Sequence, residues 1–262
     1  TGPYLEGPGG FIWAFPSLST PDEARDHVNF WADRGVTSFK AYNRLDRRTL
    51  GAAIEAAHAR GIKVTGHLCS ITYRAAADLG IDNLEHGFFA ATDWVLDKEP
   101  DECPQGARQS YLDLDLEGPE FTDLVDHLVQ QGVALTSTLT VVERGAPGRE
   151  PPPPGAQRAM LPQLREQVMA RLERAGEPGN NRGELLTKYM AMEKAFYDAG
   201  GLLVVGTDPT GGGDVVPGYA NQRAVQLLIE IGLTVEQSVQ VATRNGPISL
   251  APLEDTGTGE AG

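Results

Sequence analysis

A regular alternation of short apolar runs with segments of helical length most constrains how this chain can fold. Three apolar runs occur between residues 35 and 87, over residues 36–39, 62–65 and 81–84. Amphipathic segments of helical length separate these runs. Strands that alternate with helices in this way are typical of a parallel sheet. The sequence therefore predicts an α/β fold.

Two later apolar runs bring the number of predicted strands to five. These strands extend over residues 36–40, 62–67, 81–86, 133–139 and 202–207. The helices are expected near residues 21–34, 46–60, 71–79, 119–131, 156–175, 183–199, 218–231 and 234–243. No strand signal of comparable quality precedes Val36. Five parallel strands form either an open doubly wound sheet or five of the eight strands of a barrel, and a partial barrel leaves two strand edges unpaired.

The remaining segments are organised around one predicted domain, which extends over residues 21–250. Residues 1–20 are rich in glycine, proline and aromatic residues, and we expect a loop that packs its rings onto the domain. Residues 143–182 contain a run of four prolines, which predicts an exposed excursion over the strand ends. Residues 251–262 have no pattern and are expected to form a disordered tail.

Composition narrows the classes of partner and compartment. The net charge of -14 argues against nucleic acid or an anionic membrane as a partner. No apolar run approaches the roughly 20 residues that a membrane-spanning helix needs. The two cysteines, Cys69 and Cys103, lack metal-binding spacing and favour a reducing, cytoplasmic compartment. Because the first residue is Thr1, we expect a fragment or a processed product.

Residues with chemical potential follow four of the predicted strands. Lys40, His67, His86 and Asp208 each stand at the end of an apolar run. Because parallel strands end at the same edge of a sheet, we expect these side chains to cluster there. Neutral imidazole is a common metal ligand, and a carboxylate beside a metal can bind the ion or accept a proton from water.

Lys40 leaves three alternatives open, because lysine is seldom buried unless it is paired or chemically used. Its amine could attack a carbonyl substrate and form a Schiff base. It could instead capture carbon dioxide as a carbamate, whose two oxygens would bridge two metal ions. The third alternative is an ion pair with Glu85 or Asp208. Strand alternation predicts that Glu85 points away from the side of His86.

Asp208 and two tyrosines complete the set of candidates. Asp208 stands in the segment GTDPTGGG, where it also suits a turn before Pro209, and the glycines that follow could bind a phosphate group. Tyr42 and Tyr219 lie on predicted loops at the strand ends, where they could contact a substrate.

Five stretches together resemble the amidohydrolase superfamily, and most closely its imidazolonepropionase-like and prolidase-like metal-dependent hydrolases. They are TSFKAY, AAHARGIKVTGHL, IDNLEHG, LLVVGTDPTGGG and LLIEIGLTVEQSVQVATRNG, in that order. The resemblance implies a partial (β/α)8 TIM-type barrel that contains strands 4 to 8. It also implies a hydrolase that uses metal-activated water to cleave an amide C–N bond in a cyclic amide or a peptide-like substrate.

The resemblance assigns a role to each of the strand-end residues. Lys40 matches a carboxylated lysine that bridges metal ions, and His67 and His86 match histidine ligands. Asp208 matches an aspartate that is both a metal ligand and the general base. The implied cofactors are the carbon dioxide that forms the carbamate and one or two divalent ions, with zinc as the expected metal.

The chain also departs from the family pattern. It contains no His-x-His pair, which the family carries on its first strand, and it stops where a small β domain would begin. We therefore expect a fragment that lacks the first strands and that can associate into homo-oligomers through its unpaired edges. Two other functions stay open at this point, namely a Schiff-base lyase of the aldolase type that uses Lys40 and a truncated fragment without catalytic activity.

Overall fold

The computed structural model describes residues 2–10, 12, 14–209 and 215–250, and these contain one parallel sheet. Its six strands are hydrogen-bonded in the order of the sequence. They are β1 (Tyr4–Leu5), β2 (Ser38–Ala41), β3 (Lys63–Gly66), β4 (Asn83–Glu85), β5 (Ala134–Ser137) and β6 (Leu203–Val205). Sequential order with helical connections is the arrangement of a barrel rather than of a doubly wound sheet, in which the order reverses. The predicted α/β fold with a parallel sheet is confirmed.

The first strand, β1, was not expected. Tyr4 pairs with Lys40 and Leu5 with Ala41 in parallel register, so residues 1–20 are not a loop throughout. A strand of two residues is too short to show any periodicity. Before it, a side chain at Gly2 would stand only 1.5 Å from the carbonyl oxygen of Ser38, so the close approach of the two backbones requires glycine there.

β1 changes which strand lies at the edge of the sheet. The first strand that the sequence predicts, over residues 36–40, was expected to be one of the two unpaired edges, and this is wrong because β2 is paired on both sides. Among the described strands, β1 and β6 are the two that pair on one side only. The association of chains through strand edges stays a prediction.

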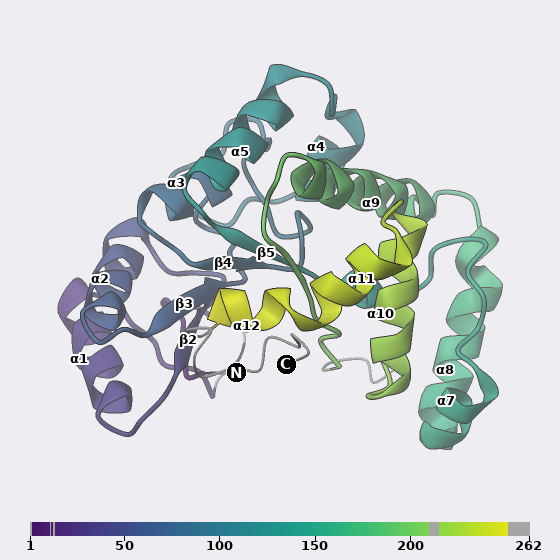
Figure 1. Cartoon of the computed structure of the whole chain (residues 1–262), viewed down its shortest axis with the longest axis horizontal. Helices are drawn as coiled ribbons and strands as arrows, with labels where there is room; N and C mark the ends of the chain where they lie inside the picture. The colour runs from purple at the N-terminus through teal and green to yellow at the C-terminus, as the bar shows by residue number, and fades with distance from the viewer. Residues whose placement is uncertain (1, 11, 13, 210–214, 251–262) are drawn as a thin grey trace.

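Helices cover the sheet and fill the connections between its strands (Figure 1). They are α1 (Pro21–Ala32), α2 (Arg47–His58), α3 (Tyr73–Asp78), α4 (Ala107–Asp113), α5 (Pro119–Gln130), α6 (Leu139–Val142), α7 (Pro154–Ala159), α8 (Pro162–Glu173), the 3-10 turn η1 (Arg174–Gly176), α9 (Arg182–Asp198), α10 (Tyr219–Glu230), α11 (Val235–Thr243) and α12 (Asn245–Leu250). Thr20 caps α1, because its side chain accepts a hydrogen bond from the amide of Glu23.

Several elements differ from the sequence-based predictions. The predicted helix over residues 156–175 is interrupted between α7 and α8, because Pro162 disfavours helical geometry at the residue before it. The predicted strand over residues 133–139 ends earlier, where the chain turns into α6. The helices α4, α6 and α12 were not predicted, and all three are short.

The core lies between the sheet and the helices. The fully buried strand residues include Phe39, Ala41, Val64, Leu84, Leu135 and Leu203. Several side chains that alternate with them are polar and form hydrogen bonds, such as that from Thr65 to Glu85. On β4, Asn83 accepts a hydrogen bond from Thr136 at 2.8 Å and donates one to Ser249 of α12 at 3.0 Å. This contact holds α12 against the strands.

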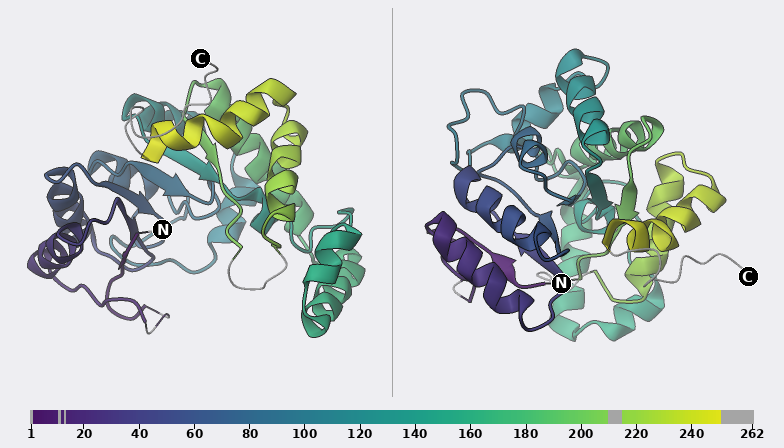
Figure 2. Two further views of the ribbon diagram at one scale, coloured as in Figure 1. Left: turned by 60° about the horizontal axis from the view of Figure 1, so that its bottom comes forward. Right: turned by 60° about the vertical axis from the view of Figure 1, so that its left-hand side comes forward.

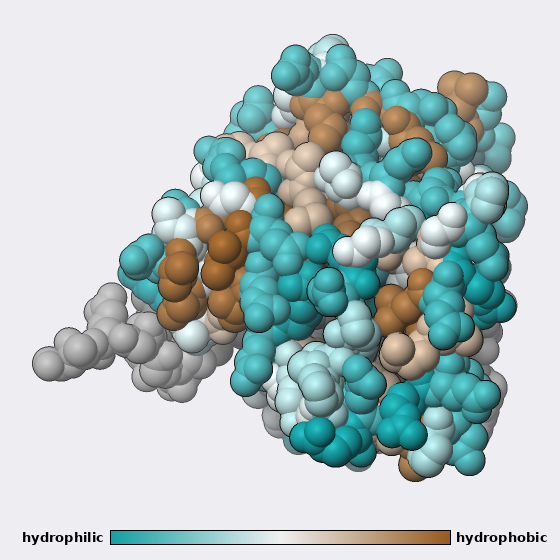
Figure 3. Space-filling view, turned by 90° about the vertical axis from the view of Figure 1, so that its right-hand side faces the viewer, coloured by the Kyte–Doolittle hydropathy of each residue, from teal (hydrophilic) through white to brown (hydrophobic). Residues whose placement is uncertain are grey.

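The segment over residues 143–182 contains α7 and α8, which project away from the sheet (Figures 1 and 2). Most of its residues are exposed, although Ala146 and Ala156 are buried. Figure 3 views the molecule from this side, where hydrophilic residues predominate and hydrophobic residues form separate patches. We call residues 143–182 the excursion.

Cys69 and Cys103 form a disulfide, with their Cα atoms 4.9 Å apart. Disulfides are rare in reducing compartments, so these two cysteines no longer support a cytoplasmic location, which stays a prediction. The described helices include none that combines the length and apolar character needed to cross a membrane. The predicted tail over residues 251–262 lies outside the described residues.

The burial of Phe39 predicts a large effect of truncation. Phe39→Ala should lower the free energy of unfolding by about 3–5 kcal/mol, because it leaves a cavity under the strand that carries Lys40. Urea denaturation measures this value. Phe30→Ala is the matched control, since Phe30 is 49% exposed, and it should cost less than about 1 kcal/mol. Equal costs for the two variants would contradict the described packing.

Candidate active site

The ends of β2, β3, β4 and β6 bring the four strand-end candidates to one edge of the sheet. The ring centroids of His67 and His86 lie 4.4 Å apart. His86 Nδ1 lies 3.9 Å from Asp208 Oδ2. Lys40 forms an ion pair with Glu85, and another Glu85 contact reaches His86 Nε2 at 4.0 Å. The sheet thus places one lysine, two imidazoles and two carboxylates together.

A left-handed turn positions His86. Its φ angle is +69° and that of Gly87 is +57°, so the chain leaves β4 abruptly at this point. The turn interrupts the alternation of side chains, and Glu85 and His86 both face the site. The prediction that Glu85 points away from His86 is therefore wrong. Asp208 also has a positive φ, +43°, and such backbone geometry is found preferentially at functional sites.

A hydrogen bond orients the ring of His86. Thr138, which directly follows β5, lies with its hydroxyl oxygen 2.8 Å from Nδ1 of His86. The imidazole is 6% exposed, so it has little freedom to rotate. Since Nδ1 is engaged, Nε2 is the nitrogen that remains available to a ligand or a metal ion.

The amine of Lys40 is held in an ion pair with the Glu85 carboxylate in this structure. The side chains are 12% and 18% exposed, and Thr65 donates a hydrogen bond to the other Glu85 oxygen at 2.6 Å. Of the three alternatives for Lys40, the described geometry corresponds to the ion pair. Glu85 is thus part of the site, although its strand position alone did not indicate this.

Electrostatics favours neutral imidazoles. Burial, together with the nearby His86 and Lys40, lowers the pKa of His67 to about 3. Burial also lowers the pKa of His86, against the opposing influence of Glu85. The neutral ring is the form that binds metal ions. Burial raises the pKa of Tyr42 to about 12, so its phenol keeps its proton, and its ring contacts His67 at 4.9 Å between centroids.

The site contains side chains of the types that bind divalent ions, but they are not arranged as a complete set of ligands. Within the described residues, no group of three or more His, Cys, Asp and Glu side chains is arranged to hold a metal ion. Two neutral imidazoles and the Asp208 carboxylate are donors of the types that zinc prefers. A carbamate on Lys40 would have to replace the ion pair with Glu85, so the carbamate and the metal stay predictions.

The second tyrosine candidate lies elsewhere. Tyr219 is the first residue of α10, is 38% exposed and lines a pocket between α10 and the excursion. Tyr42 and Tyr219 therefore belong to two adjoining parts of the strand-end face, and a contact of either with substrate stays a prediction.

Comparisons with known proteins identify the fold. No protein-family model and no curated protein matches the sequence. Solved structures do match. Bottromycin amidohydrolase is 19% identical with a TM-score of 0.66, and the match covers 95% of this chain and 54% of that one. A putative prolidase from Bifidobacterium longum is 20% identical with a TM-score of 0.58, covering 94% and 53%.

The chain has the fold of about half of an amidohydrolase. A further structure named as an amidohydrolase is 15% identical with a TM-score of 0.56, and the match covers 93% of this chain and 50% of that one. The predicted resemblance to the amidohydrolase superfamily and the predicted partial barrel are therefore confirmed at the level of fold. At sequence identities of 15–20% these likenesses establish the shared fold, and activity and substrate are a separate question.

Behind the candidate site lies a buried acid that the sequence pattern did not indicate. Glu193 of α9 is 1% exposed, and one carboxyl oxygen makes no hydrogen bond. The other would stand 2.2 Å from a side chain at Gly87, so glycine is needed beside His86. The spacing of Glu193 from the buried Tyr189 and Phe196, four and three residues away, is the signal that could have revealed it.

Burial of Glu193 predicts a pH dependence of stability. Burial raises the pKa of Glu193 to about 8 from a usual value of 4.5. Between these values the folded chain holds a proton that the unfolded chain has released, so this group lowers stability as the pH rises. Glu193→Gln removes the effect. Its stability relative to wild type should increase by about 1 kcal/mol or more between pH 5 and pH 8.

Urea denaturation at several pH values measures this difference. Glu184→Gln is the matched control, because Glu184 is exposed on the same helix. If the two variants followed the same pH profile, the assignment of a buried, protonated Glu193 would be wrong.

Proposed function

We propose that this chain carries the strand-end catalytic residues of a metal-dependent hydrolase that cleaves an amide C–N bond in a cyclic amide or a peptide-like substrate. The observation that carries the proposal is the pair of imidazoles, 4.4 Å apart between centroids, beside the Asp208 carboxylate in an amidohydrolase fold. The chain spans about half the length of the solved structures it matches, so the activity of the whole protein is part of the proposal.

The histidines would hold the ion. A bound divalent ion, with zinc as the candidate, supplies Lewis-acid activation of water and of the substrate carbonyl. His67 and His86 are suited to bind it because both rings are neutral at pH 7. Thr138 fixes the His86 ring through Nδ1 and leaves Nε2 for coordination.

Asp208 and Glu85 would act in proton transfer. Asp208 accepts the proton of the attacking water and returns it to the leaving nitrogen, which must be protonated to depart. Starting from the ammonium that pairs with Glu85, carbamate formation releases two protons, one as the amine becomes neutral and one as its nitrogen bonds to the carbon of carbon dioxide. Glu85 already contacts that amine, so it is placed to accept the first proton, and the second would pass to water. The resulting anion on Lys40 would then serve as a ligand.

A second candidate function rests on Lys40 alone. Its side chain is 12% exposed at the strand-end edge, where an amine could form a Schiff base with a carbonyl substrate. Borohydride with a carbonyl substrate would trap such an enzyme, whereas a carbamylated lysine cannot be trapped. Stable covalent labelling that is lost in Lys40→Ala would favour the lyase over the hydrolase.

Metal content tests the proposed hydrolase. With bicarbonate present, the wild-type chain should bind at most one divalent ion tightly, and Lys40→Ala and His67→Ala should lose it. Three protein ligands are the usual number in an open catalytic zinc site, and Lys40, His67 and His86 would supply them. Elemental analysis after dialysis measures the ratio of metal to protein.

The control is Lys63→Ala, which makes the same change at the opposite end of β3, where Lys63 pairs with Asp82. It should retain the metal. Two tightly held ions per chain, or unaltered metal content in Lys40→Ala, would refute the assignment of Lys40 as a ligand.

A further inference from the structure

A pocket of about 480 Å³ lies between the excursion and α10. One wall of the pocket comes from the excursion and consists of Pro151, Pro152, Pro153 and Ala156. The other wall consists of Val215, Val216, Tyr219 and Ala220. Cavities of about 300–1,000 Å³ are typical of small-molecule sites. The pocket is thus large enough for one sizeable chemical group.

The pocket adjoins the candidate active site. Thr140 lines it, and its hydroxyl donates a hydrogen bond to the carbonyl of Thr207 at 3.1 Å, directly before Asp208. Thr138, two residues before Thr140, forms the hydrogen bond to Nδ1 of His86. A substrate whose reacting bond lies at His86 and Asp208 can therefore place a neighbouring group in this pocket.

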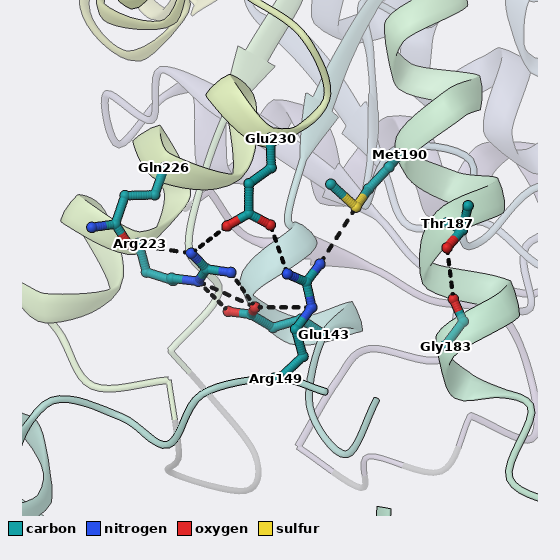
Figure 4. Close-up of polar contacts among 8 residues, drawn as sticks. All are labelled: Glu143, Arg149, Gly183, Thr187, Met190, Arg223, Gln226 and Glu230. Carbon is teal, nitrogen blue, oxygen red and sulfur yellow. Dashed lines mark hydrogen bonds and ion pairs between the residues drawn. The ribbon is translucent and has the colours of Figure 1, made fainter. Parts of the chain in front are cut away.

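Four of the five charged side chains of the pocket neutralise one another (Figure 4). We call Glu143, Arg149, Arg223 and Glu230 the ion-pair quartet. Arg223 contacts Glu143 at 2.8 Å and Glu230 at 2.7 Å, and Arg149 contacts Glu230 at 2.6 Å. Although burial raises it, hydrogen bonds from Arg223 and Arg149 lower the pKa of Glu230, so the carboxylate stays ionised. Two cations and two anions leave no net charge.

This neutrality restricts what the pocket can bind. A charged ligand group would lose its hydration without gaining an unpaired partner, because each charge of the quartet is already paired. The remaining acidic residue of the lining, Glu150, is exposed and would repel an anion. An uncharged apolar group would instead gain the burial of its surface against prolines, valines and alanines.

We infer that this pocket holds an uncharged, apolar side group of the substrate, aliphatic or aromatic, next to the scissile amide, and that it rejects an anionic group at that position. The inference rests on the proposed function for the identity of the ligand as a substrate. The preference for a neutral group follows from the pocket itself.

The test compares two probes of similar shape and different charge. N-acetyl-L-leucinamide is neutral, and the α-amide of N-acetyl-L-glutamic acid carries a carboxylate on its side chain. Titrations followed by the NMR shifts of backbone amides give the affinities and locate the binding. The wild-type chain should bind the neutral probe about tenfold more tightly, with the largest shifts in α10 and residues 148–156.

Two variants separate charge from shape. Glu230→Gln removes one anion of the quartet and leaves the arginines incompletely paired, so it should tighten binding of the anionic probe about fivefold or more. Val216→Phe fills the pocket and should weaken binding of the neutral probe. Glu173→Gln is the matched control, because it makes the same change at an exposed position on α8, outside the pocket.

The outcomes distinguish this inference from the proposed function. Equal affinities of the two probes for wild type, shifts outside the pocket, or the same response in Glu173→Gln as in Glu230→Gln would overturn it. Lys63→Ala should leave probe binding unaltered, because Lys63 pairs with Asp82 at the opposite end of β3 and does not line the pocket. If His67→Ala and Lys40→Ala retain the metal while the neutral probe still binds in the pocket, the hydrolase assignment fails and the pocket assignment stands.

Discussion

Parallel pairing of the strands is the constraint on which the candidate site depends. Each of β2 to β6 follows its predecessor in the same direction, so the chain segments that follow them emerge at one edge. Lys40 and Asp208 are 168 residues apart in sequence, yet both lie within the same group of contacts around Glu85 and His86. Antiparallel pairing would send alternate strand ends to opposite edges and separate these groups.

Within that frame, Glu85 determines the state of Lys40. Both members of a buried ion pair lose their hydration, and the attraction between them offsets that cost only at close contact. The net contribution of the pair to stability is therefore small. A substitute contact of similar strength, such as a carbamate with an ion, can therefore replace it at modest cost. The same pair would hold the amine in place before carbon dioxide arrives. The described ion pair and the proposed carbamate are thus compatible as two states of one residue.

The sequence predicted what depends on local pattern and missed what depends on distant contacts. Periodicity and caps located the parallel strands from β2 onward and most of the long helices, together with the residues at the strand ends. β1 is too short to show a pattern, and its pairing with β2 depends on a close backbone approach at Gly2. The proximity of His86 to Glu85 follows from the positive φ of His86, and strand alternation does not predict such a φ for a residue other than glycine.

The buried acid and the ion-pair quartet were missed for a related reason. Glu193 stands on an apolar stripe, yet one acid in a helix is ordinarily read as a solvent-facing residue. In the quartet, Arg223 pairs with Glu143 across 80 positions of sequence, and no local signal marks these residues as partners. A single sequence therefore indicates the excursion as a segment, but not the surface against which it packs.

The quartet would also couple the proposed substrate selection to stability in this chain. The helix α8 buries only Val168, so apolar packing of this helix contributes little to the position of the excursion. The ion pairs link the excursion to α10, and Gly155 approaches Tyr219 so closely that a side chain there would stand 2.2 Å from its hydroxyl oxygen. Because these links also form part of the pocket lining, a substitution that alters the pocket charge also loosens the wall that shapes it. The proposed selectivity would therefore depend on how the excursion docks, and not only on the side chains that face the ligand.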